Sequence, residues 1–173
     1  MNVLAGFKNI KLFVLDADGV LTDGSLLIFE DGQQVRRMNI KDGYALQLAI
    51  KKGYRILVIS GAKSKAIKKR LSLLGIKDAF FGVEDKVKLM LNYISKFRFE
   101  KEQVLYMGDD MPDLECMKMA GLATCPADAV PEIKEIAQYI SPLNGGQGCV
   151  RDIIEKVLKL NGHWQHNTAL ASR

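Results

Sequence analysis

Two acidic clusters in the sequence carry residues that could do chemistry. Residues 16–22 contain Asp16 and Asp18, and residues 108–113 contain Asp109 within Gly-Asp-Asp-Met-Pro-Asp. Either segment alone could be an acidic turn, since Asp and Gly favour loops. Several carboxylates in one crevice repel each other strongly unless a cation holds them. Hard oxygen ligands suit Mg²⁺, which keeps part of its water shell and binds substrate phosphate, so the two clusters together indicate a magnesium site.

A third group of residues could bind the phosphate of a substrate. Ser60 and Gly61 close an apolar run, and Lys86 begins a later helical pattern. A hydroxyl, a backbone N–H freed by glycine and an ammonium together offer the donors that phosphate oxygens accept. Each residue alone also has a plain structural role, Ser60 as an approach to a helix and Lys86 as a solvated lysine at a helix start. Their positions near strand ends favour phosphate chemistry.

The sequence argues against several other chemistries. It contains neither the Walker pattern G-x-x-x-x-G-K-[S/T] nor G-x-G-x-x-G nor H-E-x-x-H. None of Cys116, Cys125 and Cys149 has an arginine six residues later, which excludes a C-x₅-R phosphatase. Both histidines, His163 and His166, lie in the last eleven residues, which argues against a Ser-His-Asp triad. The available nucleophile is therefore a carboxylate.

These residues require elements that bring them together. Short apolar runs predict buried strands at residues 10–15, 55–60, 79–81, 104–107 and 122–124. Helical patterns cover residues 42–52, 64–75, 86–96, 112–120, 131–137 and 150–160. This alternation predicts an α/β fold, a Rossmann-like three-layer αβα sandwich around a mostly parallel sheet. Such sheets bind ligands beyond the carboxyl ends of their strands, where Asp16, Ser60 and Asp109 stand.

One segment interrupts the alternation of strands and helices. Residues 25–37 contain Asp31-Gly32 between two β-prone arms, which is a strong hairpin signal. The segment directly follows the loop after the first strand. We therefore expect a β-hairpin that protrudes over the carboxyl ends of the sheet.

Composition sets the outer limits of the prediction. The chain has 173 residues, 48% of them hydrophobic, and its 25 Lys and Arg against 20 Asp and Glu give a net charge of +5. We expect one domain over residues 1–161 and a tail at 162–173. No apolar run approaches the ~18 residues of a membrane span, and the first residues do not resemble a signal peptide. Three cysteines without C-x-x-C spacing are expected of a reduced, cytoplasmic protein.

In combination the motifs resemble a known superfamily. Asp-x-Asp-Gly-Val-Leu-Thr from Asp16, Ser60, Lys86 and the cluster at residues 108–113 resemble, in order and at strand ends, the four motifs of the haloacid dehalogenase superfamily. Residues 39–44, 106–113 and 145–151 are similar to those of the 3-deoxy-D-manno-octulosonate (KDO) 8-phosphate phosphatases. The resemblance implies hydrolysis of KDO 8-phosphate to KDO and inorganic phosphate, a step of lipopolysaccharide sugar synthesis.

The resemblance implies roles for the acidic residues. Asp16 would attack the phosphorus in line and form an aspartyl-phosphate. Asp18 would protonate the departing sugar oxygen and then activate water. Mg²⁺ would be held by Asp16, the backbone carbonyl of Asp18 and Asp109, with Asp110 and Asp113 supporting these ligands.

The same resemblance implies how the substrate is held. Ser60, the Gly61 N–H and the catalytic Lys86 would bind the transferring phosphoryl oxygens. From the residues themselves, basic side chains near the hairpin, at the helix of residues 64–75 or at the last helix could meet the carboxylate of the sugar acid. The candidates are Arg36, Arg37, Lys63, Arg70 and Arg151.

The chain leaves no room for a cap domain over such a site. The 60 − 18 = 42 positions from Asp18 to Ser60 hold the hairpin and one helix, and the 109 − 86 = 23 positions from Lys86 to Asp109 hold a helix and a strand. A cap needs at least about 40–50 residues of its own. An open site excludes water poorly and selects a small sugar poorly, so we expect another cover.

A neighbouring subunit could supply that cover. The hairpin arm at residues 26–29 is apolar enough to pack against another chain, although it could also fold back on its own domain. The family resemblance implies a homotetramer in which neighbouring subunits cover the active sites. The tail at 162–173 is either a frayed terminus or, by the same resemblance, a segment that reaches a neighbour's site.

Three other functions compete with this one. Many relatives carry Arg or Glu where this chain has Ala62, and often Arg where it has Gln147, so a nine-carbon 2-keto-3-deoxy acid 9-phosphate is an alternative substrate. A phosphate-accepting signalling domain also uses a strand-end Asp with Mg²⁺ and Lys, but Asp18 favours rapid hydrolysis. A nucleic-acid 3′-phosphatase fits the net charge but lacks interleaved aromatic residues for stacking bases, so we expect neither a nucleic-acid nor a membrane partner.

Overall fold

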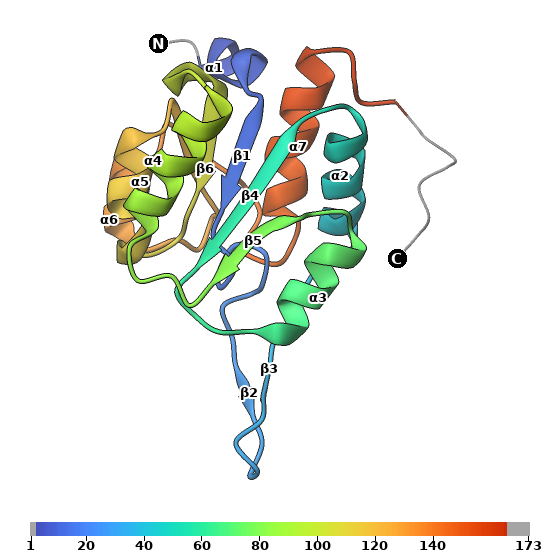
Figure 1. Cartoon of the computed structure of the whole chain (residues 1–173), viewed down its shortest axis with the longest axis vertical. Coiled ribbons are helices and arrows are strands. Elements are labelled where there is room, and N and C mark those ends of the chain that lie inside the picture. The colour runs from blue at the N-terminus through green and yellow to red at the C-terminus, as the bar shows by residue number, and fades with distance from the viewer. Residues whose placement is uncertain (1–2, 166–173) are drawn as a thin grey trace.

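Short apolar runs form the strands of a central parallel sheet. The computed structural model describes residues 3–165. The six strands lie in the order β5-β4-β1-β6-β7-β8, and every neighbouring pair is parallel (Figure 1). Their bounds are β1 (Leu12–Leu15), β4 (Arg55–Ser60), β5 (Asp78–Phe81), β6 (Val104–Met107), β7 (Leu122–Cys125) and β8 (Tyr139–Ile140).

Helices cover both faces of this sheet. One face packs against α1 (Val3–Asn9), α2 (Ile40–Lys51), α3 (Lys65–Leu73) and α7 (Cys149–Leu160). The other face packs against α4 (Lys86–Phe97), α5 (Leu114–Met119) and α6 (Pro131–Ile136), and short 3₁₀ turns η1 (Lys101–Gln103) and η2 (Met111–Asp113) precede β6 and α5. The predicted three-layer α/β fold with a parallel sheet is confirmed (Figure 1).

The alternation of side chains along each strand produces these two cores. In β1, Phe13 and Leu15 face the layer of α2 and α7, whereas Leu12 and Val14 face the layer of α4 and α5. All four side chains are fully buried, as expected for a strand in the middle of a parallel sheet. Because β1 lies between β4 and β6, its carboxyl end lies in the interior of that edge of the sheet.

Three elements differ from the sequence-based expectation. The helix α1 and the strand β8 were not predicted, and the expected helix at residues 112–120 is divided into η2 and α5. The strand β8 has only two residues and α1 only two turns, so neither carries a clear periodic pattern. The division at Met111–Asp113 places Pro112 in the first turn, where its missing N–H costs no hydrogen bond.

The predicted hairpin protrudes beyond the carboxyl edge of the sheet (Figure 1). Only β2 (Leu27–Ile28) and β3 (Gln34–Val35) pair, with Leu27 opposite Val35. At the base, Thr22 and Met38 form an antiparallel bridge that anchors the hairpin to the loop after β1. Residues 18–60 are thereby used by this loop, the hairpin, α2 and β4.

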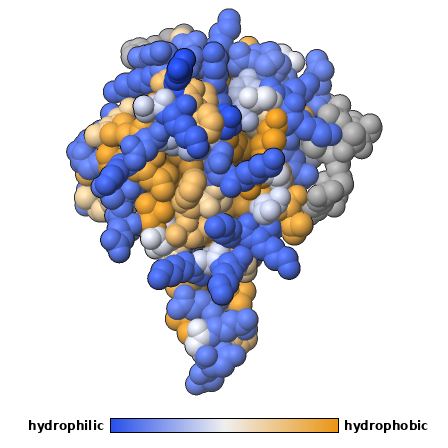
Figure 2. All heavy atoms as spheres, viewed as in Figure 1, coloured by the Kyte–Doolittle hydropathy of each residue, from blue (hydrophilic) through white to orange (hydrophobic). Residues whose placement is uncertain are grey.

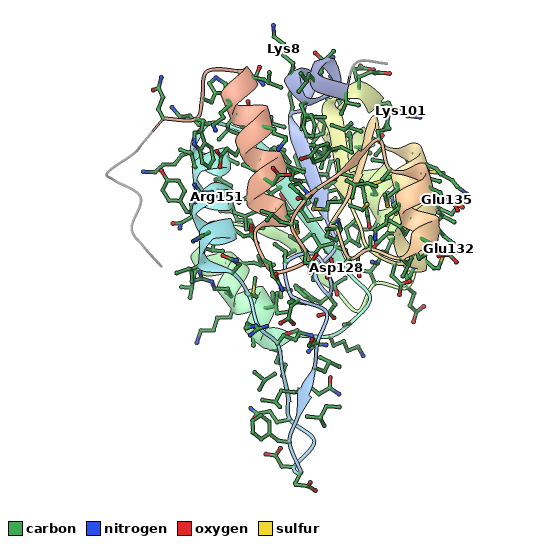
Figure 3. All side chains as sticks on the ribbon, turned by 180° about the vertical axis from the view of Figure 1, so that it is seen from behind. Lys8, Lys101, Asp128, Glu132, Glu135 and Arg151 are labelled. Atoms are coloured by element: carbon green, nitrogen blue, oxygen red, sulfur yellow. The ribbon has the colours of Figure 1, made fainter. Side chains whose placement is uncertain are left out.

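A second loop braces the one that follows β1. Gly145 approaches so closely that an added Cβ would lie 1.9 Å from the carbonyl oxygen of Gly19, so only glycine fits there. Asp128 accepts a hydrogen bond from the Gly145 N–H at 2.9 Å, and the Gly146 N–H donates to the Val20 carbonyl at 2.9 Å. Seen from behind, Asp128 lies at the end of the sheet from which the hairpin extends, whereas Lys8 and Lys101 lie at the opposite end (Figure 3).

The beginning of the predicted tail packs on its own chain. The Trp164 ring lies edge-on to Tyr44 of α2 at 6.1 Å between centroids, and Tyr54 and His163 share a hydrogen bond of 2.9 Å. The rest of the tail, with the predicted reach into a neighbour's site, lies outside the described residues. No helix within residues 3–165 is long and apolar enough to cross a membrane.

Candidate active site

A cavity opens where the carboxyl ends of β1, β4 and β6 meet. It has a volume of about 310 Å³. It lies where the chain order reverses across the sheet, since β4 and β6 flank β1 on opposite sides, and ligands of open α/β sheets bind at such a point. Its lining consists of Asp16, Asp18, Gly19, Gly24, Ser60, Gly61, Ala62, Lys86, Asp109, Asp110, Pro112 and Asp113.

The predicted catalytic, metal-ligating and phosphate-binding residues all belong to this lining. They come from four separate parts of the chain, and the parallel sheet brings them to one edge. A larger cavity of about 740 Å³ lies at the opposite end of the strands, around Lys11, Tyr54 and Gln103, and contains none of the clustered aspartates.

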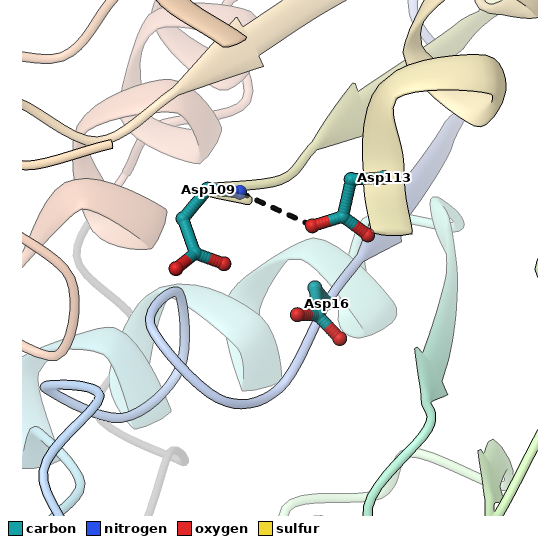
Figure 4. Close-up of side chains that lie close together, drawn as sticks. All are labelled: Asp16, Asp109 and Asp113. Carbon is teal, nitrogen blue, oxygen red and sulfur yellow. Dashed lines mark hydrogen bonds between the residues drawn. The ribbon is translucent and has the colours of Figure 1, made fainter. Parts of the chain in front are cut away.

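Three aspartates converge at the base of the cavity (Figure 4). Asp16 directly follows β1, Asp109 follows β6 after Gly108, and Asp113 ends η2. One carboxylate oxygen from each lies within 4.8 Å of the other two. This spacing is close enough for a cation to lie beside the cluster.

Lys86 links two of these carboxylates. It begins α4, and its Nζ donates to Asp16 Oδ1 at 3.0 Å and to Asp113 Oδ1 at 2.8 Å. All three side chains are buried. Burial alone would lower the pKa of Lys86, but the charges of Asp16 and Asp113 outweigh it and raise that pKa, so the ammonium stays protonated at neutral pH.

The carboxylates nevertheless carry more negative charge than one lysine can balance. Burial, followed by repulsion from Asp113, raises the pKa of Asp16 to about 7. Burial, followed by repulsion from Asp16 and Asp113, raises the pKa of Asp109 to about 8. The protein alone therefore does not hold all of these groups ionised at neutral pH, and an added cation would stabilise the ionised cluster.

Asp109 is the carboxylate with an unused ligand atom. Its Oδ1 is buried and has no hydrogen-bond partner within the described part of the chain. Asp113, in contrast, accepts from Lys86 and from Tyr106 Oη at 2.6 Å, and its Oδ2 accepts from the Asp109 N–H at 3.2 Å. These carboxylate oxygens are hard metal ligands, and one of them has no hydrogen-bond partner among the described residues. They therefore suit a divalent cation such as Mg²⁺.

Gly19 makes this arrangement possible. Its φ of +81° lies in the left-handed region, and an added Cβ would lie 2.0 Å from Asp109 Oδ2. Glycine is the one residue that adopts this conformation without strain and leaves room for the carboxylate. The Gly19 position in the first acidic motif is therefore explained by packing against the second motif.

The predicted phosphate-binding residues line the wall of the cavity beside β4. Ser60 is the last residue of β4 and is buried, and Gly61 and Ala62 follow it in the lining. The Ser60 carbonyl accepts from the Val83 N–H at 3.0 Å, which holds this turn close to the start of α4. The Ser60 hydroxyl and the Lys86 ammonium consequently belong to one wall.

Asp18 lies at the rim of the cavity rather than at its base. Its side chain is 34% exposed, and its Oδ1 accepts from Arg36 Nε at 2.7 Å. Asp110 also lines the cavity, and its Oδ1 accepts from its neighbour, the Met111 N–H, at 2.7 Å. The structure thus separates two carboxylates at the edge from three at the base.

The predicted substrate-binding cations are placed less uniformly. Arg36 contacts Asp18, and Arg37 pairs with Asp23 at 2.7 Å. Arg151 bonds Glu155 and lies 5.3 Å from the Trp164 ring, on the side of α7 that faces α2 (Figure 3). The cavity lining contains none of the five candidates Arg36, Arg37, Lys63, Arg70 and Arg151.

Tyr106 is a residue of the site that the sequence pattern does not identify. The apolar run at residues 104–107 predicts a buried strand position for it, but in the structure its hydroxyl donates to Asp113. Burial, followed by the charge of Asp113, raises the pKa of Tyr106 well above its ordinary value, so the hydroxyl keeps its proton. The available signal was a hydroxyl in the middle of a buried strand, which needs a partner.

Comparison with known proteins gives a consistent family. The haloacid dehalogenase-like hydrolase family matches residues 83–153. The 3-deoxy-D-manno-octulosonate 8-phosphate phosphatase KdsC of Escherichia coli K12 is 33% identical over 161 residues, covering 93% of this chain and 86% of that protein. KdsC of Yersinia pestis is 30% identical over 170 residues, covering 98% and 91%.

Solved structures agree in fold over nearly the whole chain. The crystal structure of 3-deoxy-D-manno-octulosonate 8-phosphate phosphatase from Yersinia pestis matches with a TM-score of 0.93 at 30% identity, covering 97% of this chain and 91% of that one. That of the same enzyme from Moraxella catarrhalis, in complex with a magnesium ion, a phosphate ion and a KDO molecule, matches with a TM-score of 0.87 at 30% identity, covering 91% of each chain.

Proposed function

Because the chain belongs to the haloacid dehalogenase-like hydrolases, in the family of the KDO 8-phosphate phosphatases, we propose that it hydrolyses the phosphate monoester of KDO 8-phosphate through an aspartyl-phosphate intermediate. The products are KDO and inorganic phosphate. One observation carries the proposal: a single cavity gathers two outer carboxylates at its edge (Asp18 and Asp110), three inner carboxylates at its base (Asp16, Asp109 and Asp113), a lysine and a Ser-Gly turn. This set matches the needs of phosphoryl transfer.

In this reaction Asp16 is the nucleophile. A carboxylate oxygen of Asp16 attacks the phosphorus, and the bond to the sugar oxygen breaks. Lys86, which donates to Asp16 Oδ1 at 3.0 Å, holds that carboxylate in one orientation. Asp18 at the rim protonates the departing sugar oxygen and then removes a proton from the water that hydrolyses the aspartyl-phosphate.

The phosphoryl oxygens are held by the opposite wall. The Ser60 hydroxyl and the Gly61 N–H donate to them, and the Lys86 ammonium neutralises part of their charge. Tyr106 and the Asp109 N–H fix Asp113, which in turn holds Lys86 at 2.8 Å. Asp113 therefore supports the site from below.

The carboxylates and one backbone oxygen are suited to hold Mg²⁺. Asp16, the backbone carbonyl of Asp18 and Asp109 would be its protein ligands, and Asp110 and Asp113 would support them. A bound Mg²⁺ supplies positive charge that offsets the repulsion between the attacking carboxylate and the phosphate. The raised pKa values of Asp16 and Asp109 support this assignment, as does Asp109 Oδ1, which has no hydrogen-bond partner among residues 3–165.

The working form that we propose is a cytoplasmic homotetramer. The exposed apolar side chains of the hairpin support contact with other subunits, and a neighbour placed there would cover the open cavity. The three cysteines, Cys116, Cys125 and Cys149, are buried free thiols, which supports a reducing compartment.

A nine-carbon 2-keto-3-deoxy acid 9-phosphate is the second candidate substrate. The observation that favours it is Ala62, which lines the cavity with a methyl group beside the Ser60–Gly61 turn. A small side chain there leaves space for a longer sugar and provides no charge to select the shorter one.

A panel of phosphate monoesters tests the substrate assignment. We expect kcat/KM for KDO 8-phosphate to exceed that for the nine-carbon acid phosphate, for glucose 6-phosphate and for a 3′-phosphorylated oligonucleotide by at least about 10-fold, or about 1.4 kcal/mol. Activity should require Mg²⁺ and disappear with EDTA. Equal rates on all substrates would overturn the specific assignment, and a preference for the nine-carbon acid would select the second candidate.

The Asp16→Asn variant tests the nucleophile. The amide keeps the shape of the side chain but attacks phosphorus poorly, so we expect turnover to fall by at least about 10³-fold. Wild-type protein quenched during turnover should carry an acid-stable phosphate on Asp16, and the variant should carry none. An unchanged circular dichroism spectrum is the control for folding. Substantial residual turnover in the folded variant would contradict the assignment.

A further inference from the structure

The ion pair between Arg36 and Asp18 joins the hairpin to the proposed acid and base. Arg36 follows β3, and its Nε donates to Asp18 Oδ1 at 2.7 Å. The Arg36 side chain is 9% exposed although it comes from a protruding hairpin. A guanidinium this well covered, at hydrogen-bond distance, restricts the rotation of its partner far more than a solvated surface pair does.

The surrounding contacts make the hairpin base and the Asp18 loop one unit. Thr22 pairs with Met38 across the base, and Arg37 pairs with Asp23 at 2.7 Å. The Thr22 hydroxyl oxygen accepts from the Gly19 N–H at 3.2 Å and lies 3.5 Å from Asp18 Oδ1. Moving the hairpin therefore moves the residue that holds Asp18.

Two other cations near the site have carboxylate partners of their own. Lys86 bonds Asp16 and Asp113, and Arg37 bonds Asp23. Among the ion pairs of residues 3–165, the one that includes Asp18 is formed with Arg36. In the described part of the chain, both side-chain contacts of Asp18 fall on Oδ1, which leaves Oδ2 to exchange a proton with a leaving group or water.

We propose that Arg36 is a positioning residue that acts through Asp18, not a ligand of the substrate carboxylate. It fixes the Asp18 side chain at the rim of the cavity with Oδ2 available for proton transfer, and it makes the hairpin part of the catalytic unit. This inference rests on the proposed role of Asp18 but not on the identity of the sugar. It applies to any alkyl phosphate that the enzyme turns over.

Substrates that differ in leaving group and in charge test the inference. An alkoxide leaves poorly without a proton, whereas p-nitrophenolate leaves without one. In Arg36→Met we expect kcat to fall about 10- to 100-fold for the sugar-acid phosphate and for glycerol phosphate, which has no carboxylate, with KM nearly unchanged. The single-turnover release of p-nitrophenolate should change less than about 3-fold. Arg36→Lys, which keeps the charge, should recover part of the loss.

A double-mutant cycle shows whether the effect passes through Asp18. In an Asp18→Asn background, Arg36→Met should cause no further loss of kcat on glycerol phosphate, because residues that act as one unit are not additive. Arg37→Met is the matched comparison, since it breaks the neighbouring ion pair and measures what loosening the hairpin base costs by itself. On alkyl phosphates, the loss of kcat in Arg36→Met should exceed the loss in Arg37→Met by at least about 5-fold.

Three results would overturn the inference. A rise in KM confined to the sugar-acid phosphate would make Arg36 a carboxylate ligand. An equal loss on p-nitrophenyl phosphate would indicate general disruption, and additive losses in the cycle would show that Asp18 is not involved. Failure of the proposed substrate is a separate outcome, because glycerol phosphate and p-nitrophenyl phosphate report on Arg36 even if KDO 8-phosphate is not hydrolysed.

Discussion

Individual hydrogen bonds divide the inner carboxylates into two kinds. Asp113 accepts from three donors and is fully buried, so its position is fixed by the protein. Within residues 3–165, Asp109 keeps one buried oxygen without a hydrogen-bond partner, and Asp16 shares its lysine with Asp113. The residue with satisfied oxygens supports the site, and those with spare capacity are free to bind a cation.

This division predicts how the stability of the metal-free protein depends on pH. The folded-state pKa values of Asp16 and Asp109, about 7 and about 8, lie above the ordinary value of 3.8, so the folded state binds more protons than the unfolded state between pH 4 and pH 8. The free energy of unfolding in EDTA should therefore fall as pH rises through this range. Thermal unfolding at pH 5, 6, 7 and 8 measures it.

Mg²⁺ should reverse this loss, most strongly at high pH. At about 100 times its Kd, binding adds about 2.7 kcal/mol, which corresponds to roughly 5–10 °C in Tm for a chain of this size. The rise should be smaller at pH 6 than at pH 8, because protons compete with the ion. Asp109→Asn is the control and should lose most of the rise. An equal rise at both pH values would contradict the prediction.

Elements that lie far apart in the sequence hold the site through a buried cap. The helix α7 begins after Gly148, which has no side chain to cap it. Asp42, in the first turn of α2, takes this role, since its Oδ1 accepts from the Arg151 N–H at 2.7 Å. The loop before α7 packs against Gly19 and Val20, in the loop that follows β1. The cap therefore connects both helices to the loop that holds Asp18.

Replacing Asp42 by Asn should change the pH dependence of stability. Burial raises the pKa of Asp42 to about 6, although hydrogen bonds from the Arg151 and Gly148 N–H groups oppose this. Ionisation therefore costs up to about 3 kcal/mol of folding stability as pH rises from about 4 to above 6. Asn keeps an acceptor oxygen without the charge. Asp42→Asn should be more stable than wild type at pH 7.5 by roughly 1–3 kcal/mol, with little gain at pH 4.5.

Urea unfolding of both proteins at the two pH values, in EDTA, gives this difference directly. The comparison with wild type cancels the contributions of Asp16 and Asp109, which both proteins share. Asp42→Ala removes the cap, so its free energy of unfolding should be about 1 kcal/mol lower than that of Asp42→Asn. If Asn and Asp proteins differed equally at both pH values, the carboxylate of Asp42 would not be the titrating group.

The convergence of Asp16, Ser60 and Asp109 was predictable because parallel strands bring their carboxyl ends to one edge of the sheet. The contact between Arg36 and Asp18 was not predictable, since it depends on the orientation of a hairpin whose strands have only two residues each. Sequence periodicity describes the faces of regular elements, but the Thr22–Met38 bridge that anchors the hairpin leaves no periodic signal. The cap of α7 by Asp42 could not be predicted either, because the hydrogen bond joins two residues that are 109 positions apart in the sequence.

The shape of the whole molecule leaves an apolar projection beside an open cavity. Leu27 and Ile28 are 60% and 65% exposed, and Leu26, Phe29 and Val35 are also exposed. Figure 2 shows hydrophobic side chains along the edges of the hairpin, between hydrophilic ones, and a further hydrophobic area on the body above it. Adjacent apolar side chains of this kind mark a surface that associates. The hairpin extends from the same edge of the sheet that holds the cavity, so a partner on it can also cover the site (Figure 1).

Charged residues on the hairpin should therefore separate the subunits and weaken catalysis together. Leu27→Glu with Ile28→Glu would place unpaired carboxylates in the contact, each costing several kcal/mol of association. Light scattering should show a tetramer for wild type and a monomer for this variant. The Tm of the monomeric variant should stay within a few degrees of the wild-type Tm. With the cavity uncovered, kcat/KM for the sugar-acid phosphate should fall at least about 10-fold. Leu91→Glu, at an exposed leucine of α4, is the matched control and should remain tetrameric and active. A wild-type protein that is monomeric and fully active would show that the site needs no neighbour.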